Sequence, residues 1–304
     1  MSRHRLHLPA VFIAVSLCVL GVSTARAGEL SHARIVRLSW VEGEVQYQRG
    51  TGDWEDATAN LPIQEGFSLA TGAGYAEVEF EDGVRMWLAQ NSSVTFGELA
   101  LDGEMRISQM QVTTGTVIVS VPSTKHDNVS LSHDGLQLTV PRSGRFRVDV
   151  AGTGSWVTVL KGKIDANTGA GVQSISSEQT LHFDSANPSG TAVDRSPATD
   201  DFGRWVEARE QALNRAQAGT TRLLNVKGYS AGLADLTTYG TWYNMSFGGS
   251  CWAPAVFGEW SPYIAGHWTW FQRTGWTWVS DEPWGWIPYH FGAWAETTSG
   301  WCWT

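Results

Sequence analysis

A short aromatic repeat in the C-terminal part of the chain constrains its fold more than any other feature. Residues 239–304 contain 12 of the 17 tryptophans. The pattern Trp-x-Pro-x-x-x-Gly-x-Trp occurs three times, beginning at Trp252, Trp260 and Trp286. A motif that recurs in this way is typical of one structural unit used repeatedly. We therefore expect residues 239–304 to form a small Trp-rich domain.

Spacing within this region predicts short antiparallel strands. Trp-x-Trp pairs occur at 268/270, 276/278, 284/286 and 301/303. Residues two apart on a strand point to the same face, so each strand would carry its indoles on one side. Gly and Pro recur between these pairs, as they do at tight turns. Pro254, Pro262 and Pro288 lack a backbone donor and are expected at strand ends, edges or bulges.

Most of the indoles are expected in a core. The region has few other large apolar side chains, so it cannot fold with most of its tryptophans in water. A minority left on a groove could stack on a sugar or a peptide. Candidate ligand-binding residues are aromatic and histidine side chains of the later repeats, namely Tyr263, His267, Trp268, Trp286, Tyr289, His290 and Trp294.

The N-terminal segment is typical of an export signal. Arg3 and Arg5 are basic, residues 8–22 form an apolar run, and Ala25-Arg26-Ala27 fits a cleavage site. The run is short for a membrane span, although an uncleaved anchor is the alternative. We therefore expect residues 1–27 to be a signal peptide. The mature protein would be periplasmic or secreted, with no membrane span after cleavage.

The charge balance narrows the class of partner. Residues 1–27 hold three Arg and no acidic residue, so the mature chain would carry 18 basic and 30 acidic side chains, a net charge of −12. This balance argues against nucleic acid and anionic lipid as partners. The candidate partners that remain are an envelope protein, an envelope polymer or a glycan.

Two cysteines, Cys251 and Cys302, lie outside the export signal. In an oxidising compartment such a pair predicts a disulfide, and two buried free thiols are the alternative. The bond would clamp nearly the whole Trp-rich region and stabilise it by roughly 4 kcal/mol. Zinc is disfavoured, because no further Cys or His lies at ligand spacing.

Alternating apolar residues predict continuous β-structure over residues 34–183. Asp82-Gly83 and Asp134-Gly135 are typical of hairpin turns. Three glycines fall between strand-like halves, as expected for bulges or corners: Gly43, Gly115 and Gly162. The predicted class is mainly β, with this region forming a β-sandwich or a short β-solenoid built of hairpins.

Five motifs in this region resemble the FecR domain. In chain order they are Leu38–Val45, Asp82–Leu88 with Asn91–Val94, Thr114–Val117, Arg145–Val148 and Val157–Ile164. The resemblance implies a non-enzymatic β-domain of bacterial envelope proteins, whose founding members pass a signal from an outer-membrane transporter to a sigma factor. Such a regulator needs a cytoplasmic segment, and few residues precede Leu8 here. Sigma-factor regulation is therefore the least favoured function.

A linker and a helix should connect the two β-regions. Residues 184–200 have loop composition, and residues 201–218 have helical spacing. Asp200 or Asp201 would cap the helix and Gly219 would end it. The inward residues would be Phe202, Trp205, Arg209, Leu213 and Ala216. We expect the helix to dock on a domain, because isolated helices of this length are marginal in water.

The helix and the Trp-rich region together are similar to an uncharacterised Trp-rich region that follows FecR domains in bacterial exported proteins. The motifs that carry the similarity are Phe202–Trp205, Asp235–Gly240, Trp278–Gly285 and Pro288–Gly292. This resemblance implies no known activity.

The sequence contains no motif of a known catalytic or cofactor site. Asp281 and Glu282 could form an acid–base site with His267 and His290, but adjacent acids on a turn are usually solvated. His126-Asp127 and His133-Asp134 lack a third metal ligand nearby. We therefore predict no catalytic, cofactor or metal residue. The predicted function is an exported binding or scaffold protein, and the alternative is a carbohydrate or cell-wall binding module acting through exposed Trp and Tyr.

Overall fold

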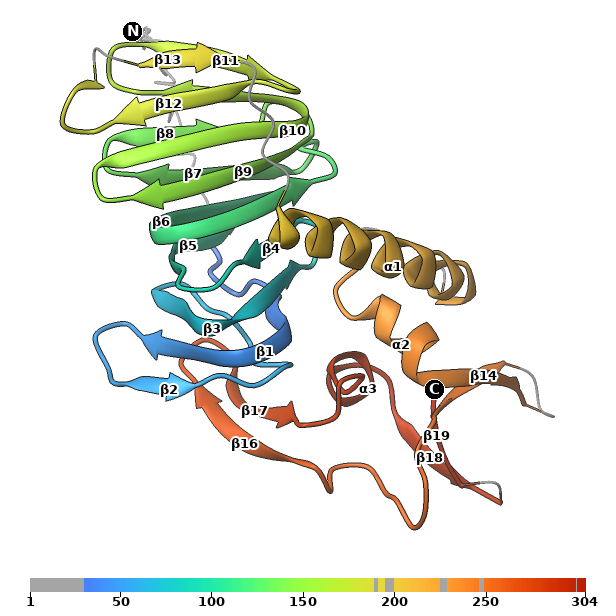
Figure 1. The fold of residues 1–304 in the computed structure, drawn as a ribbon. Helices are drawn as coiled ribbons and strands as arrows, with labels where there is room; N and C mark the ends of the chain where they lie inside the picture. The colour runs from blue at the N-terminus through green and yellow to red at the C-terminus, as the bar shows by residue number, and fades with distance from the viewer. Residues whose placement is uncertain (1–29, 189–190, 195–199, 225–228, 246–248, 299) are drawn as a thin grey trace, which may run out of the picture.

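The computed structural model of the chain describes residues 30–188, 191–194, 200–224, 229–245, 249–298 and 300–304. The predicted signal peptide, residues 1–27, lies outside these ranges. A tall β-unit is followed by two helices and a smaller C-terminal unit, which lies below the β-unit in Figure 1. Within the described ranges, no helix is long and apolar enough to cross a membrane.

The β-unit is a single sheet of 13 strands. Its neighbouring strands are antiparallel, except that β6 and β7 run parallel. The predicted hairpin turns at Asp82-Gly83 and Asp134-Gly135 are confirmed between β3 and β4 and between β7 and β8. The strands are β1 (Val36–Arg49), β2 (Trp54–Asp56), β3 (Phe67–Phe80), β4 (Arg85–Leu88), β5 (Ser93–Asp102), β6 (Met105–Val121), β7 (Asp127–His133), β8 (Leu136–Thr139), β9 (Gly144–Ala151), β10 (Gly154–Asn167), β11 (Val172–Ser176), β12 (Thr180–Asp184) and β13 (Ala192–Asp194).

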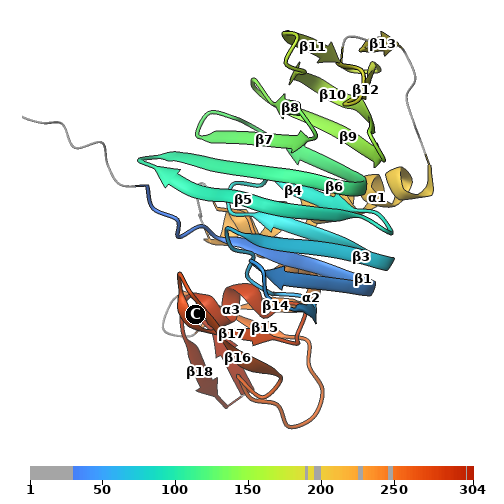
Figure 2. The ribbon, with the colours of Figure 1, turned by 90° about the vertical axis from the view of Figure 1, so that its left-hand side faces the viewer.

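The long strands bend at glycines, so the two halves of one strand lie in two different layers of the β-unit. The first half of β6 pairs with β5 and β7, and its second half pairs with β4 and β9. The bend lies at Gly115, whose φ is +82°, and a Cβ there would approach the Asn91 carbonyl oxygen to 2.5 Å. Gly43 and Gly162 also have positive φ beside register shifts, so the predicted corners are confirmed. The sheet therefore winds around one core as a short solenoid with two faces (Figure 2).

Alternation along the strands explains both the core and the covered outer face. Val117 and Val119 of β6 point into the core with Phe146 of β9. Apolar side chains at every second position favour strands because one face of the sheet is then buried. Ile118 and Trp87 alternate outward, yet both are fully buried because a helix covers them.

That helix is α1 (Asp201–Leu224), which begins as predicted but extends further. Asp200 Oδ1 accepts a hydrogen bond from the Gly203 N–H at 2.8 Å and caps the helix. The predicted stop at Gly219 is wrong. Thr220 is buried, and its hydroxyl lies 2.6 Å from that of Thr237 in α2 (Leu233–Tyr239), so packing outweighs the roughly 1 kcal/mol cost of one helical glycine.

The docking of α1 on the β-unit is confirmed. Phe202 and Val206 pack against Trp87 and Ile118. The Trp205 ring stacks on Tyr75 with centroids 5.0 Å apart. In the segment expected as a linker, β13 adds instead to the edge of the sheet by pairing with β12.

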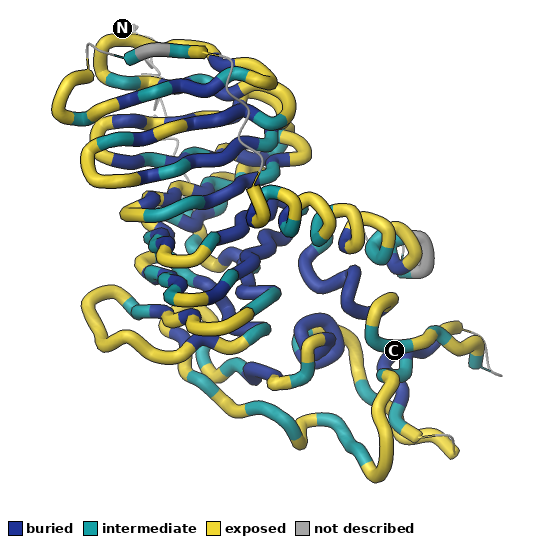
Figure 3. Tube along the Cα trace, viewed as in Figure 1, coloured by how far each residue is buried: buried dark blue, intermediate teal, exposed yellow. Residues whose placement is uncertain are grey.

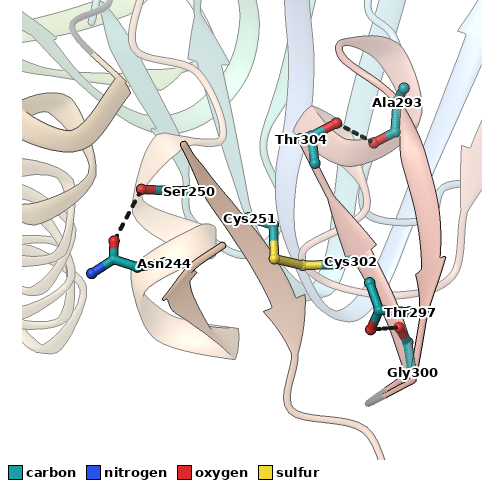
Figure 4. The surroundings of a disulfide bond; sticks show 8 residues. All are labelled: Asn244, Ser250, Cys251, Ala293, Thr297, Gly300, Cys302 and Thr304. Carbon is teal, nitrogen blue, oxygen red and sulfur yellow. Dashed lines mark hydrogen bonds between the residues drawn. A yellow bond between two sulfur atoms is a disulfide. The ribbon is translucent and has the colours of Figure 1, made fainter. Parts of the chain in front are cut away.

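The C-terminal unit contains one sheet of four strands, in the order β14-β15-β19-β18, and a separate hairpin, β16–β17. The expected antiparallel pairing is confirmed. The predicted disulfide is present between Cys251 of β15 and Cys302 of β19, whose Cα atoms lie 5.7 Å apart (Figure 4). The elements are β14 (Gly240–Asn244), β15 (Ser250–Pro254), β16 (Gly266–Phe271), β17 (Gly275–Ser280), α3 (Trp286–His290), β18 (Trp294–Thr297) and β19 (Gly300–Trp303).

The three copies of the repeat adopt different structures. Pro254 ends β15 as predicted, and Pro262 lies in a turn before β16. The strand expected around Pro288 and the pair Trp284/Trp286 is wrong, because this copy forms α3. Pro288 is tolerated there because the N–H groups of the first helical turn have no partner within the helix.

Two of the three copies have a common packing device despite these differences. Their glycine lets an indole from a neighbouring strand lie directly on the backbone, whereas Gly258 of the first copy has no such neighbour. A Cβ on Gly266 would lie 2.8 Å from the Trp278 ring, and a Cβ on Gly292 would lie 2.9 Å from a ring carbon of Trp303.

Buried, partly buried and exposed segments all occur in the C-terminal unit (Figure 3). The expectation of an aromatic core is confirmed for most of its 12 indoles, because nine are buried or partly buried. The rings meet mainly edge to face, as for Trp252 with Trp284 at 5.3 Å and 60°. Five are buried (Trp252, Trp278, Trp284, Trp286 and Trp303), four are partly buried (Trp242, Trp260, Trp294 and Trp301), and three are exposed (Trp268, Trp270 and Trp276).

Candidate ligand-binding face

The hairpin β16–β17 has one face inside the molecule. Phe271 and Val279 are 1% and 0% exposed, and both belong to the core of the β-unit. The Phe271 ring stacks on Phe67 of β3 with centroids 6.3 Å apart. The hairpin therefore closes the end of the β-unit that carries β1 and β2 (Figure 1).

Polar contacts fix the hairpin along this seam. Arg273 pairs with Glu65 at 2.8 Å. The Asn60 side-chain amide donates to the carbonyl oxygens of Ser280 at 3.1 Å and Glu282 at 2.8 Å. Because Asn60 is itself 1% exposed, these bonds are shielded from water and hold the hairpin in one orientation.

The opposite face of the hairpin presents indoles to solvent. Cross-strand pairing places Trp268 opposite Trp278 and Trp270 opposite Trp276. The rings of the two pairs meet edge to face, with centroids 5.6 Å and 5.7 Å apart. Trp268, Trp270 and Trp276 are 58%, 55% and 65% exposed. Tyr263 extends the row, 5.5 Å from Trp278. We call these five side chains the indole face.

The structure divides the seven predicted ligand-binding residues. Tyr263 and Trp268 lie on the indole face. His267 is exposed, but it alternates to the other side of β16. Trp286 and Tyr289 are 5% and 8% exposed, and Trp294 is partly buried among other indoles, so these three side chains are core residues rather than an exposed surface.

Trp270 and Trp276 belong to the face but were missed among the predicted residues. The signal was available in the sequence. Two Trp-x-Trp pairs, 268/270 and 276/278, flank a short turn at residues 272–274, and antiparallel pairing across it brings all four indoles to one side. Phe271 and Val279 occupy alternate positions, so their apolar side chains indicate that the opposite face of the hairpin is buried.

His290 lies away from the indole face, at a cavity of about 170 Å³ between the two units. Its Nδ1 is 2.7 Å from the Trp286 carbonyl oxygen, and its ring lies 4.5 Å from the Trp286 indole. Burial lowers the pKa of His290, which favours a neutral imidazole that donates its Nδ1 hydrogen to that carbonyl. These contacts give His290 a packing role beside Trp286.

The carboxylate of Glu282 organises the core around it. It accepts hydrogen bonds from the Tyr289 hydroxyl at 2.5 Å and from Trp260 Nε1 at 2.6 Å. Burial raises the pKa of Glu282, against the effect of these bonds. Its neighbour Asp281 is exposed. In the described part of the chain, no group of three or more His, Cys, Asp or Glu is placed to hold a metal ion.

A buried charge cluster joins the β-unit to α2. Arg37 is 1% exposed and pairs with Glu79 at 2.7 Å and with Asp235 at 2.6 Å. Burial opposes ionisation of Glu79, but Arg37 and Arg85 outweigh it and lower the pKa of Glu79 to about 2. Burial is the larger effect on Asp235 and raises its pKa to about 6, although Arg37 opposes this. Buried ion pairs therefore hold α2 against the β-unit.

Comparison with known families divides the chain at α1. Residues 68–165, from β3 to β10, match the family described as FecR protein. Residues 233–304, which hold the whole indole face, match a family of unknown function, DUF6600.

Among solved structures, similarity is limited to part of the chain. Two crystal structures of a candidate anti-sigma factor from Parabacteroides distasonis ATCC 8503 share 13% and 14% identity with it, each with a TM-score of 0.37. Each match covers 43% of this chain and 60% of that protein. Curated proteins give no match.

Proposed function

Because the chain combines a FecR domain with a DUF6600 region, we propose that it is a non-catalytic envelope module of the signalling and regulatory class, with the indole face as its binding surface. The observation that supports this most directly is the exposure of Trp268, Trp270 and Trp276 while the other nine indoles of the region are at least partly buried. Contiguous exposed apolar patches on a soluble protein commonly mark interaction sites.

The construction of the face also supports a binding role. Edge-to-face packing restrains the rings, and Phe271 and the Asn60 bonds anchor the strands behind them. Aromatic side chains have only two χ angles, so these indoles lose little conformational entropy when a partner covers them. The face is thus pre-organised for a partner.

An envelope location fits the same picture. The disulfide between Cys251 and Cys302 is of the kind that persists in oxidising compartments such as the periplasm. The predicted signal peptide and the FecR family both favour export. We therefore propose that the protein acts in the periplasm or outside the cell.

Binding to isolated bacterial envelope fragments tests the proposal. The purified protein should co-sediment saturably, and the double variant Trp270→Ala/Trp276→Ala should lose most of this binding. Tyr243→Ala is the matched control, because Tyr243 is an aromatic residue with 54% exposure on β14, outside the indole face. Equal co-sedimentation of all three proteins, or none with the wild type, would contradict the proposal.

A further inference from the structure

We propose that the ligand of the indole face is an uncharged, linear, β-linked polysaccharide, held by contact of its pyranose rings with Trp268, Trp270 and Trp276. This inference rests on the proposed function and names the ligand class for the same surface.

The size of the face favours a thin ligand. Three indoles exposed by somewhat more than half present about 400 Å² of aromatic surface, taking about 200–250 Å² for a whole indole. A stable protein–protein interface covers about 800 Å² on each partner. The face is therefore too small to hold a protein partner or a second copy of this chain by itself, whereas a few stacked sugar rings match it.

The charge of the face favours a neutral ligand. All five of its side chains are uncharged indoles or a phenol. Residues 239–304 contain one Arg and no Lys, and the whole chain has a net charge of −9. Two arginines lie beside this face, and both are already paired: Arg49, which donates to the Trp270 carbonyl oxygen at 3.4 Å, pairs with Glu55, and Arg273 pairs with Glu65. Charge complementarity therefore gives no preference for anionic polymers or anionic lipid headgroups.

The shape of the face fits an extended chain of flat rings. Trp268 and Trp270 are two residues apart on β16, which separates them by about 7 Å along the strand. Equatorial β-linkages leave the axial C–H groups of each pyranose on flat faces, and these groups carry the partial positive charge that an indole face attracts. Gln272 at the hairpin turn and Asp281 beyond β17 are exposed, so both ends of the row offer polar groups for sugar hydroxyls.

Titration with defined oligosaccharides tests this inference. Cellohexaose and chitohexaose are added to the full-length disulfide-bonded protein, and binding is followed by calorimetry and by the emission of the exposed indoles. We expect saturable binding of at least one of them with a blue shift in emission. Trp270→Ala and Trp276→Ala should each weaken binding by about tenfold. Trp270→Tyr should retain part of the affinity, and Tyr243→Ala should retain all of it.

Two results would overturn the ligand class. One is the absence of binding to either oligosaccharide at millimolar concentration, and the other is binding that the Trp270 and Trp276 variants leave unchanged. Neutral phosphatidylcholine vesicles are the second probe, and vesicle binding that depends on Trp270 would assign the face to a lipid surface instead. If the oligosaccharides fail while envelope co-sedimentation still depends on these indoles, only the ligand class is wrong and the proposed function stands.

Discussion

The two faces of the hairpin β16–β17 should respond oppositely to truncation. Phe271 is 1% exposed within the core of the β-unit, which contains the FecR domain, whereas Trp276, five residues along the same hairpin, is 65% exposed. Phe271→Ala and Trp276→Ala therefore form a matched pair. The first tests whether the DUF6600 region completes the FecR core, and the second reports what loss of an exposed ring does to stability.

The expected magnitudes are well separated. A buried Phe removes about 150 Å² or more of apolar surface from water, which is worth roughly 4 kcal/mol at about 25 cal/mol/Å². Truncation to Ala costs roughly 3 kcal/mol of this, because the methyl group of Ala stays buried. The cavity left beside Phe67 brings the total to about 3–5 kcal/mol. Trp276→Ala removes mainly an edge-to-face contact with Trp270, which is worth about 0.5–1.5 kcal/mol.

Urea unfolding followed by tryptophan fluorescence measures both losses, because most indoles lie in the C-terminal region. Phe271→Ala should lower the unfolding midpoint strongly, and hydrogen exchange should show faster opening of β16 and β17. Trp276→Ala should shift the midpoint little. If the two variants lose the same stability, or if Phe271→Ala costs less than about 1 kcal/mol, the hairpin does not close the FecR core.

Three further predictions concern the bonds that hold the C-terminal unit. Reduction of the disulfide between Cys251 and Cys302, which are 51 residues apart, should destabilise the unit by about 4 kcal/mol. Reductant should therefore lower the melting midpoint of the wild type and leave that of the double variant Cys251→Ser/Cys302→Ser unchanged. Arg37→Met should cost about 3–5 kcal/mol in urea unfolding, because it leaves the buried carboxylate of Asp235 without its ion-pair partner and leaves Glu79 paired with Arg85. Asp235 has a folded pKa of about 6 against 3.8 unfolded, so its contribution to stability is full below pH 3.8 and lost as pH rises through 6. Asp235→Asn should therefore flatten the stability profile between pH 4 and 7, and an unchanged profile would contradict this.

Local patterns in the sequence predicted the β-unit well. Period-two alternation, Asp-Gly turns and corner glycines depend on neighbours in the chain, and they hold here because each strand pairs mainly with strands close in sequence. The helix start at Asp200 is a local cap and was predicted, whereas its end was not. Thr220 is held by Thr237, and no local signal reports such a tertiary contact.

The candidate site was predicted only in part, for a related reason. Spacing identifies which indoles share a face, but burial depends on what lies against that face. The third repeat copy has the same pattern as the second, yet Tyr289 is buried and Trp294 is partly buried, whereas the equivalent Tyr263 and Trp268 are exposed. The buried cluster around Arg37 joins residues about 200 positions apart in sequence and was equally invisible.

The C-terminal unit does not behave as the self-contained domain that its repeats suggest. A region of this size has a high ratio of surface to volume, and its indoles alone make a small core. It therefore depends on a disulfide, on the charges around Arg37, and on insertion of Phe271 and Val279 into the core of the β-unit that contains the FecR domain. One consequence concerns signalling. Any ligand that binds only the ordered indole face stabilises the docked hairpin by mass action, and the other face of that hairpin is part of the FecR core. A partner on the surface would thus change the stability of the FecR domain without touching it.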